Sequence, residues 1–357
     1  MLIHICCSVD SHYFLKKLKS DFPNETLIGY FYDPNIHPYS EYLLRFEDVK
    51  HSCKTLGIKL IMGEYDLDLW YNGAKEMANE PEKGKRCEYC FDFRLENTAK
   101  KAKELGENKI TTTLLMSPKK SLCQLNESLK NVCDKFELNY IAPDYRKNGG
   151  TTEQMSLAKS DNLYAQNYCG CLFALKKQRD VQNIFISEMI SNIGKQELPN
   201  SIDEKLNLYR KVHRLKDKQD KFEIIKDRFL NYRLLSAYVK FDNLVVDSYI
   251  LYLSKFRREI VNLTLKKAQN IAFCKDEIKF ISLNFFNEIL KTDYKSVREM
   301  IYKPLKIKNE LKIRKYLCGD ESLSPIIVVD NIQNAKVEIN VKYLLFDDVR
   351  HKIVKFK

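Results

Sequence analysis

Six cysteines in the first half of the chain stand in three close groups. The groups are Cys6-Cys7, Cys87-x-x-Cys90 and Cys169-Gly-Cys171. Asp10 follows the first group by three residues. A structural zinc ion takes about four ligands, so six thiols and a carboxylate exceed what one such ion needs. The three groups therefore predict a redox metal site that is assembled from three separate segments.

Taken one at a time, the groups leave alternatives open. Neighbouring side chains diverge, so the first pair suits two sites, or two irons of one cluster, better than one ion. The second pair has a spacing found both in zinc sites and among iron–sulfur ligands. The third pair is too close for ordinary zinc spacing, and it fits either a strained, easily reduced disulfide or the thiolates of a second metal. Asp10 is equally consistent with an N-cap of the first helix.

Alternating short apolar and amphipathic segments surround these groups in the N-terminal half. Strands are expected at 2–6, 27–32, 58–62, 110–116 and 139–142, and helices at 11–19, 40–56, 92–105, 119–136 and 152–166. This alternation predicts an α/β fold of the Rossmann-like kind, with a parallel sheet and helices on both faces. Ligands of such sheets bind beyond the carboxyl ends of the strands. We expect the cysteine groups at that edge, with the second pair just before a helix that begins near 91 and the third after a helix that ends near 168.

The C-terminal half has a different composition. Helical spacing at 203–232, 255–271 and 277–291 predicts a mainly α-helical region, and 326–329 with 337–343 would form a short β-hairpin near the end. We expect two domains, 1–185 and 186–357. Residues 1–180 carry 26 Lys/Arg against 25 Asp/Glu, whereas residues 181–357 carry 34 against 23. The net charge of +12 therefore lies almost entirely in the second half, which favours a polyanion such as tRNA unless it reflects a generally lysine-rich composition.

Composition also bears on the compartment. No apolar run reaches the roughly 18–20 residues that span a bilayer, and the N-terminus lacks the basic and apolar regions of a signal peptide. In a chain of this size, clustered thiols serve metals or catalysis in a reducing compartment. We expect a cytoplasmic protein without a membrane partner.

Together, five segments resemble the QueH family of epoxyqueuosine reductases. They are His4-Ile-Cys-Cys7, Phe31-Tyr-Asp-Pro-Asn-Ile-His-Pro38, Arg86-Cys-Glu-Tyr-Cys90 with Arg94-Leu-Glu96, Thr111–Pro118 and Tyr164-Ala-Gln-Asn-Tyr-Cys-Gly-Cys171. They occur in the family's order over roughly residues 1–175. The resemblance implies reduction of the epoxide of epoxyqueuosine to queuosine at the wobble position of tRNA, with a 4Fe–4S cluster and an electron donor that the chain does not reveal. It also implies a fold like that of the nucleotide-binding PP-loop class.

The resemblance carries roles onto residues of this chain. The expected cluster ligands are Cys6, Cys7, Cys87 and Cys90. Cys169 and Cys171 would be either a redox-active pair or, with Asp10, ligands of a second, mononuclear iron. The expected proton donors are Tyr164 and His37, and the expected substrate-binding residues are Tyr32, Asn35, Arg94 and Gln166.

Two departures from the family pattern concern substrate contacts. Ala165 stands where an Arg is expected, and Lys-Lys-Ser-Leu-Cys follows Ser117-Pro118 where relatives often have an aromatic residue and a His.

Two other functions compete with the reductase. One is an iron–sulfur tRNA-thiolating enzyme of the PP-loop type, although the chain has no Ser-Gly-Gly-x-Asp-Ser loop for ATP. The other is a non-catalytic, zinc-stapled RNA-binding protein.

Overall fold

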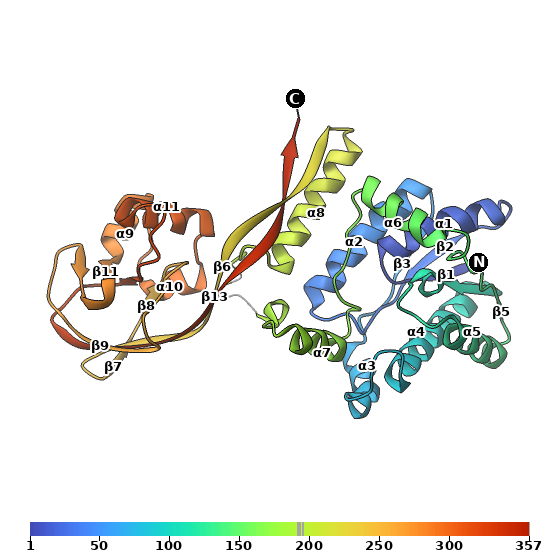
Figure 1. Cartoon of the computed structure of the whole chain (residues 1–357), viewed down its shortest axis with the longest axis horizontal. Coiled ribbons are helices and arrows are strands. Elements are labelled where there is room, and N and C mark those ends of the chain that lie inside the picture. The colour runs from blue at the N-terminus through green and yellow to red at the C-terminus, as the bar shows by residue number, and fades with distance from the viewer. Residues whose placement is uncertain (191–193, 195, 357) are drawn as a thin grey trace. The chain divides into compact units, whose positions relative to one another are not determined.

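The computed structural model describes residues 1–190, 194 and 196–356, and these residues form two compact units (Figure 1). The first unit contains Met1–Glu188, Lys205–Ile224 and the C-terminal residues from Ile353. The second unit contains the described residues of Met189–Glu204 and Ile225–Lys352. The first break lies close to the expected boundary at 185, but two segments of the C-terminal half pack with the first unit.

A five-stranded sheet organises the first unit. Its strands are β1 (Leu2–Ile5), β2 (Ile28–Phe31), β3 (Lys59–Met62), β4 (Lys109–Thr112) and β5 (Asn139–Tyr140). They lie in the order β3-β2-β1-β4-β5, and every neighbouring pair is parallel. The predicted parallel α/β fold is therefore confirmed. The strand expected at 110–116 is shorter, because Thr113–Met116 turns into a 3-10 helix that the side chain of Thr112 caps.

Seven helices accompany this sheet in the segment up to residue 188. They are α1 (Ser8–Asp21), α2 (Tyr39–Leu56), α3 (Leu67–Ala74), α4 (Lys85–Glu104), α5 (Leu122–Phe136), α6 (Gly150–Ser160) and α7 (Leu172–Gln182), with 3-10 turns at Lys75–Met77 and Ser187–Met189. The central strand β1 is fully buried between the helices, with Phe14 of α1 and Leu95 of α4 in the same core.

Two expectations about the cysteine groups need correction. Helix α4 begins at Lys85, so Cys87 and Cys90 lie inside its first turns and not before it. No Pro or Gly interrupts the segment after Gly84, so the helix runs through the motif. Helix α6 ends at Ser160 and not near 168, which leaves the third cysteine pair in a loop that leads into α7.

The expectation of a mainly helical C-terminal half is wrong. After α8 (Ile202–Asp217) the chain forms β6 (Phe222–Phe241), β7 (Leu244–Val246), β8 (Ser248–Ile250), β9 (Ile260–Leu265), β10 (Ile271–Phe273), a 3-10 turn (Lys275–Glu277), β11 (Lys279–Ser282), α9 (Leu283–Leu290), α10 (Val297–Tyr302), α11 (Ile307–Cys318), β12 (Ile326–Val329) and β13 (Ala335–Lys355). Burial in β9 alternates residue by residue, which is the period of a strand and not of a helix. The strands form two four-stranded sheets, β10-β11-β12-β8 and β7-β6-β13-β9.

The predicted hairpin near the C-terminus does not form either. Strand β12 pairs with β11 and β8, whereas β13 pairs with β9 and lies beside β6. The turn between β12 and β13 therefore leads from one sheet to the other.

Candidate metal centre

All three cysteine groups line one cavity at the carboxyl edge of the five-stranded sheet. The cavity has a volume of about 220 Å³, and its walls include Cys6, Cys7, Asp10, Cys87, Cys90, Cys169 and Cys171. All eleven cysteines of the chain are free thiols. Each group reaches the cavity from a different element: the end of β1, the first turns of α4, and the loop before α7. The structure thus brings the three groups together, as the fold class predicted.

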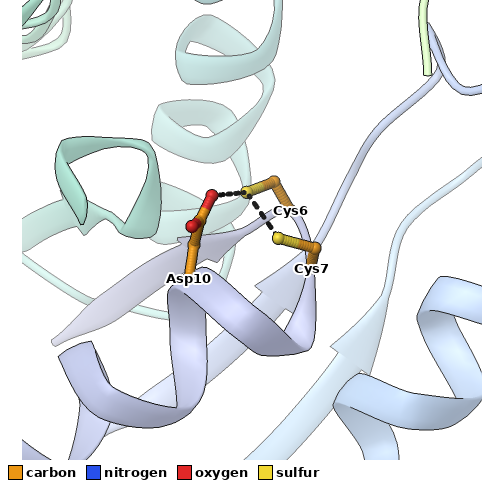
Figure 2. A group of neighbouring side chains, drawn as sticks. All are labelled: Cys6, Cys7 and Asp10. Atoms are coloured by element: carbon orange, nitrogen blue, oxygen red, sulfur yellow. Dashed lines mark hydrogen bonds between the residues drawn. The ribbon is translucent and has the colours of Figure 1, made fainter. Parts of the chain in front are cut away.

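The first group forms a compact set of possible metal ligands at the start of α1 (Figure 2). The Sγ atom of Cys6 lies 3.8 Å from that of Cys7 and 3.9 Å from Oδ2 of Asp10. The ligand atoms of these three residues all lie within 4.8 Å of one another. Asp10 does not cap the helix, because Cys7 occupies the N-cap position. Its Oδ1 accepts a hydrogen bond of 2.8 Å from Gln154.

The other four thiols, those of Cys87, Cys90, Cys169 and Cys171, also line the cavity. Cys90 and Cys171 belong to one small apolar cluster with Trp70. The ammonium of Lys120 lies 3.1 Å from Sγ of Cys169, and it also interacts electrostatically with Cys87 and Cys90. Asp10 thus lies beside Cys6 and Cys7, whereas its expected role was with Cys169 and Cys171.

The environments of these groups set different protonation states. Burial raises the pKa of Cys171 to about 12 and also raises that of Cys90. Burial alone would raise the pKa of Cys169 as well, but Lys120 together with two arginines lowers it below the ordinary thiol value. Burial raises the pKa of Asp10, although hydrogen bonds to its carboxylate oppose the shift. Cys169 is therefore the thiol of the third group that most readily forms a thiolate.

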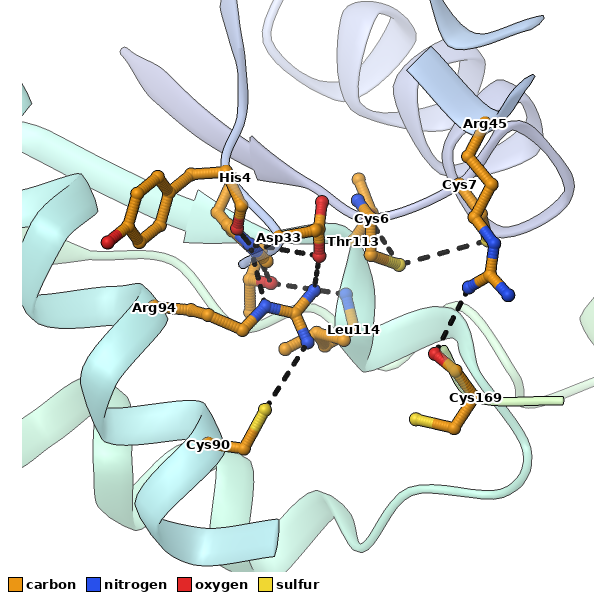
Figure 3. Close-up of polar contacts among 12 residues, drawn as sticks. His4, Cys6, Cys7, Asp33, Arg45, Cys90, Arg94, Thr113, Leu114 and Cys169 are labelled. Atoms are coloured by element: carbon orange, nitrogen blue, oxygen red, sulfur yellow. Dashed lines mark hydrogen bonds and ion pairs between the residues drawn. The ribbon is translucent and has the colours of Figure 1, made fainter. Parts of the chain in front are cut away.

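Two buried arginines hold the walls of the cavity (Figure 3). Arg45 on α2 donates to the carbonyl oxygens of Tyr168 and Cys169, each at 3.0 Å, and to Glu41 at 2.7 Å. It thereby fixes the backbone of the loop that carries the third cysteine group. Sequence reasoning missed Arg45, because an arginine within an amphipathic helix gives no signal of its own.

Arg94 forms a second network of polar contacts near the ends of β1 and β2. It pairs with Asp33, donates from Nε to Nε2 of His4 at 3.3 Å, and lies 4.0 Å from Sγ of Cys90. Burial raises the pKa of Asp33 to about 6 even though Arg94 and Arg45 oppose that shift. Arg94 and Asp33 both line the cavity, so the expected position of Arg94 at the site agrees with the structure.

Gln166 also lines the cavity, and its Nε2 donates to Sγ of Cys7 at 3.0 Å. Lys120 was visible in the sequence only as a departure from the family pattern. Its position beside Cys169 makes it a functional candidate.

Four other expected site residues do not line the cavity. Tyr164 is buried, and its hydroxyl donates to Glu41 at 2.9 Å. The hydroxyl of Tyr32 donates to Asp66 at 2.8 Å. Asn35 is buried, and the backbone N–H of His37 donates to the carbonyl oxygen of Gly170 at 2.9 Å. The structure therefore places these four residues outside the wall of the cavity, and their expected roles as proton donors and substrate-binding residues stay predictions.

The donor set fits an iron or iron–sulfur centre. Thiolates are soft ligands that bind zinc, copper(I) and iron–sulfur clusters, whereas a carboxylate beside two thiols adds a harder oxygen donor. Six thiols and one carboxylate in one cavity provide enough donors for a cluster and a further metal ion. The fold and site thus define a Rossmann-like α/β protein with a cysteine-rich cavity at the carboxyl edge of its sheet.

Comparison with known proteins identifies the family. The model of the family described as epoxyqueuosine reductase QueH matches residues 1–177. An epoxyqueuosine reductase QueH of Helicobacter pylori is 38% identical over 356 residues, which cover 96% of this chain and 97% of that protein. One of Thermotoga maritima is 36% identical over 183 residues, which cover 50% of this chain and 92% of that protein. The chain belongs to the QueH family, and the resemblance seen in the sequence is confirmed.

The comparisons also separate the two halves of the chain. Residues 178–357 lie outside the family model, whereas the similarity to the Helicobacter pylori protein extends over nearly the whole chain. Among the described residues, no helix combines the length and apolar character needed to cross a membrane.

Proposed function

We propose that this chain reduces the epoxide of epoxyqueuosine in tRNA to give queuosine. The observation that carries the proposal is the convergence of six thiols and Asp10 on one cavity, in a chain that covers 97% of a relative named as this reductase. Membership of the QueH family disfavours both alternatives, the tRNA-thiolating enzyme and the zinc-stapled RNA-binding protein.

The reaction sets a demand for electrons and protons. When the epoxide oxygen leaves as water, both of its carbon–oxygen bonds break and a carbon–carbon double bond forms. Each turnover therefore consumes two electrons and two protons, and the electrons come from a donor outside the chain. Because the substrate is part of tRNA, tRNA is the macromolecular partner of this reaction.

We assign the two ligand groups of the cavity to two metal centres. Cys87, Cys90, Cys169 and Cys171 would hold a 4Fe–4S cluster, and Cys6, Cys7 and Asp10 would hold a mononuclear iron. This grouping follows the proximity of Asp10 to the first cysteine pair and the packing of Cys90 against Cys171. It replaces the expectation that the first and second pairs share the cluster. When bound, such a cluster supplies electrons one at a time, and an iron with an open coordination position polarises an oxygen atom.

The side chains around the cavity offer hydrogen-bond acceptors and cationic groups to a substrate. Gln166 Oε1 and Asp33 Oδ2 are buried and have no hydrogen-bond partner among the described residues, so both can accept from hydroxyl or N–H groups of the substrate. The Lys120 ammonium holds a proton at Nζ beside Cys169. We propose that Lys120 and Arg94 stabilise negative charge that develops as the oxygen leaves.

Anaerobic turnover tests the proposed function. Reconstituted protein, a chemical reductant and epoxyqueuosine-containing tRNA should give queuosine in a nucleoside mass analysis. Cys87→Ser should abolish both turnover and the absorption near 400 nm that is typical of an iron–sulfur cluster. The matched control is Cys53→Ser, since Cys53 is buried on α2 away from the cavity and should leave both readouts intact. Unchanged epoxyqueuosine with iron-loaded protein would overturn the proposal.

The assignment of two centres has its own test. Asp10→Ala should lower the iron content by about one iron per chain while leaving the sulfide content unchanged. Cys90→Ser should lower iron and sulfide together. Loss of sulfide in Asp10→Ala would contradict this assignment and would make Asp10, Cys6 and Cys7 ligands of the cluster.

A further inference from the structure

A strongly basic helix face lies in the second unit, far along the chain from the metal centre. We call it the α11 surface and define it by Lys306, Lys308, Lys312, Lys315 and Tyr316. All five side chains are exposed, and Tyr316 retains 66% of its accessible surface. Lys306 is the N-cap of α11, and the other four residues lie on the helix (Figure 1).

The helix period places three of these lysines on one side of α11. Residues 308, 312 and 315 are separated by four and three positions, so their side chains project from the same face over about 10 Å of helix. The opposite face of α11 is buried through Ile307, Ile313 and Arg314. The lysines are therefore not needed for packing, and they remain available to a partner.

Little acidic charge offsets the α11 surface. Glu310, the acidic residue within the helix, is buried and hydrogen-bonded to Tyr249 and to the backbone N–H of Tyr252. Lys315 pairs with Asp320 at 2.6 Å just beyond the helix end. Lys306, Lys308 and Lys312 have no ion-pair partner within the part of the chain that the structure describes. A row of unpaired cations beside an exposed tyrosine ring matches the way proteins hold nucleic acid, in which lysines contact phosphates and aromatic rings stack on bases.

The segment just before α11 continues the same composition. Lys295, Arg298, Tyr302 and Lys303 are all exposed, and Tyr302 retains 74% of its accessible surface. Arg298 pairs with Asp247 and Lys303 with Glu299, so these two cations are partly offset. The unpaired lysines of α11 are thus the centre of the basic region.

We propose that the α11 surface binds the sugar–phosphate backbone of tRNA and so holds the substrate on the enzyme. The proposal rests on the proposed function, because that function makes tRNA the partner. The surface lies outside residues 1–177, so it would add a tRNA contact that the family-wide reductase domain does not itself provide. An apolar partner is disfavoured, since Leu311 and Tyr316 are the large hydrophobic side chains that α11 exposes, beside several lysines.

Binding of unmodified tRNA to the full chain tests the proposal independently of catalysis. The variant carries Lys308→Gln, Lys312→Gln and Lys315→Gln. Each phosphate contact contributes about 0.7–0.9 to the slope of log affinity against log salt, so the variant should reduce that slope by about two to three and weaken binding roughly 10-fold or more near physiological salt. The matched control carries Lys266→Gln, Lys267→Gln and Lys336→Gln, which are exposed lysines of the same unit and give the same change in net charge. The control should stay within about two-fold of the wild type, as expected of exposed charges without a partner.

Turnover with a chemical reductant provides the second readout. The α11 variant should raise KM for tRNA by a similar factor and leave kcat and the iron content unchanged. Equal affinity and equal slope in the variant and the wild type would overturn the proposal, as would equal weakening by the control. A defect seen only with a protein electron donor would also overturn it and would assign the surface to an acidic donor protein. If wild-type protein binds tRNA through this surface but does not reduce the epoxide, the proposed function fails, whereas the proposal that the α11 surface binds tRNA holds.

Discussion

Replacement of His213 tests whether helix α8, which comes from the C-terminal half of the chain, stabilises the first unit. His213 is buried on α8, and its Nε2 lies 2.7 Å from Oδ1 of Asp48 on α2. The other oxygen of Asp48 accepts from the hydroxyl of Ser8 and from the backbone N–H of Tyr164, the latter at 2.8 Å. One carboxylate therefore joins α8 to the residue after Cys7 and to the loop that leads to Gln166.

The contacts of His213 give the size of the expected effect. A hydrogen bond to a charged group stabilises a protein by about 1.5–3 kcal/mol, and His213→Ala would leave the buried carboxylate of Asp48 with one oxygen unpartnered. The imidazole also stacks on His51 with ring centroids 4.5 Å apart, and such a contact adds about 0.5–1.5 kcal/mol. We expect His213→Ala to lower the free energy of unfolding of the first unit by about 2–4 kcal/mol.

The chain offers a selective probe and a matched control for this measurement. Trp70 is the single tryptophan, and it is buried in the first unit, so its fluorescence in a urea titration of the metal-free protein reports that unit. His213→Gln should recover much of the loss, because its amide can donate to Asp48. His51→Ala should cost about 0.5–1.5 kcal/mol, because it removes the stacking contact with His213 while its ion pair with Asp217 at 3.4 Å, about half exposed, adds little. Equal midpoints for His213→Ala and wild type, or an equal loss in His51→Ala, would refute the anchoring of α8 through Asp48.

Three further predictions concern buried charges around the site. Arg45→Met should lower the free energy of unfolding by about 3–5 kcal/mol, because Glu41 stays buried without its partner, and thermal unfolding measures this. Hydrogen bonds to Asp48 lower its pKa although burial opposes the shift, so its stabilising contribution is complete above about pH 4 and is lost as pH falls through the lowered pKa. The difference in stability between wild type and Asp48→Asn should therefore shrink from pH 5 to pH 3. Lys120→Gln should raise the pKa of Cys169 and slow its alkylation in metal-free protein at neutral pH, as mass spectrometry of the labelled peptide would show.

The sequence predicted the first unit well because its signals are local. The five strands of the sheet are short apolar runs, and five of the seven helices have an amphipathic pattern that predicted them, so the fold class and the edge that carries Cys6 and Cys7 followed directly. Helices α3 and α7 were not predicted. The motif around Cys87 was placed just outside a helix, because a C-x-x-C spacing does not reveal whether its residues are helical. The second unit was mispredicted, since residues such as Val261 and Leu265 are four positions apart, as on one face of a helix, while the burial of this segment alternates as in a strand.

The sequence predicted the cysteines of the candidate site but missed Arg45, a charged residue that lines it. Six cysteines carry a visible spacing, and the family pattern adds Arg94 and Gln166, which line the cavity. Tyr164 and His37 lie in the same motifs, yet their contacts come from segments distant in sequence: Glu41 of α2 for Tyr164, and the loop before α7 for His37. Arg45 escaped notice because its role depends on a loop more than a hundred residues away, a contact that only the folded chain reveals.

A count of electrons and oxygen atoms tests the central claim most directly. Anaerobic, metal-loaded protein is mixed with a measured amount of chemical reductant and an excess of epoxyqueuosine-containing tRNA, and the nucleosides are then weighed by mass spectrometry. Reduction at this cavity predicts a product nucleoside lighter by one oxygen atom, with two electrons consumed for each molecule formed and no product in Cys90→Ser. A nucleoside that gains sulfur, or a product lighter by one oxygen atom that forms without loss of reducing equivalents, would contradict the account.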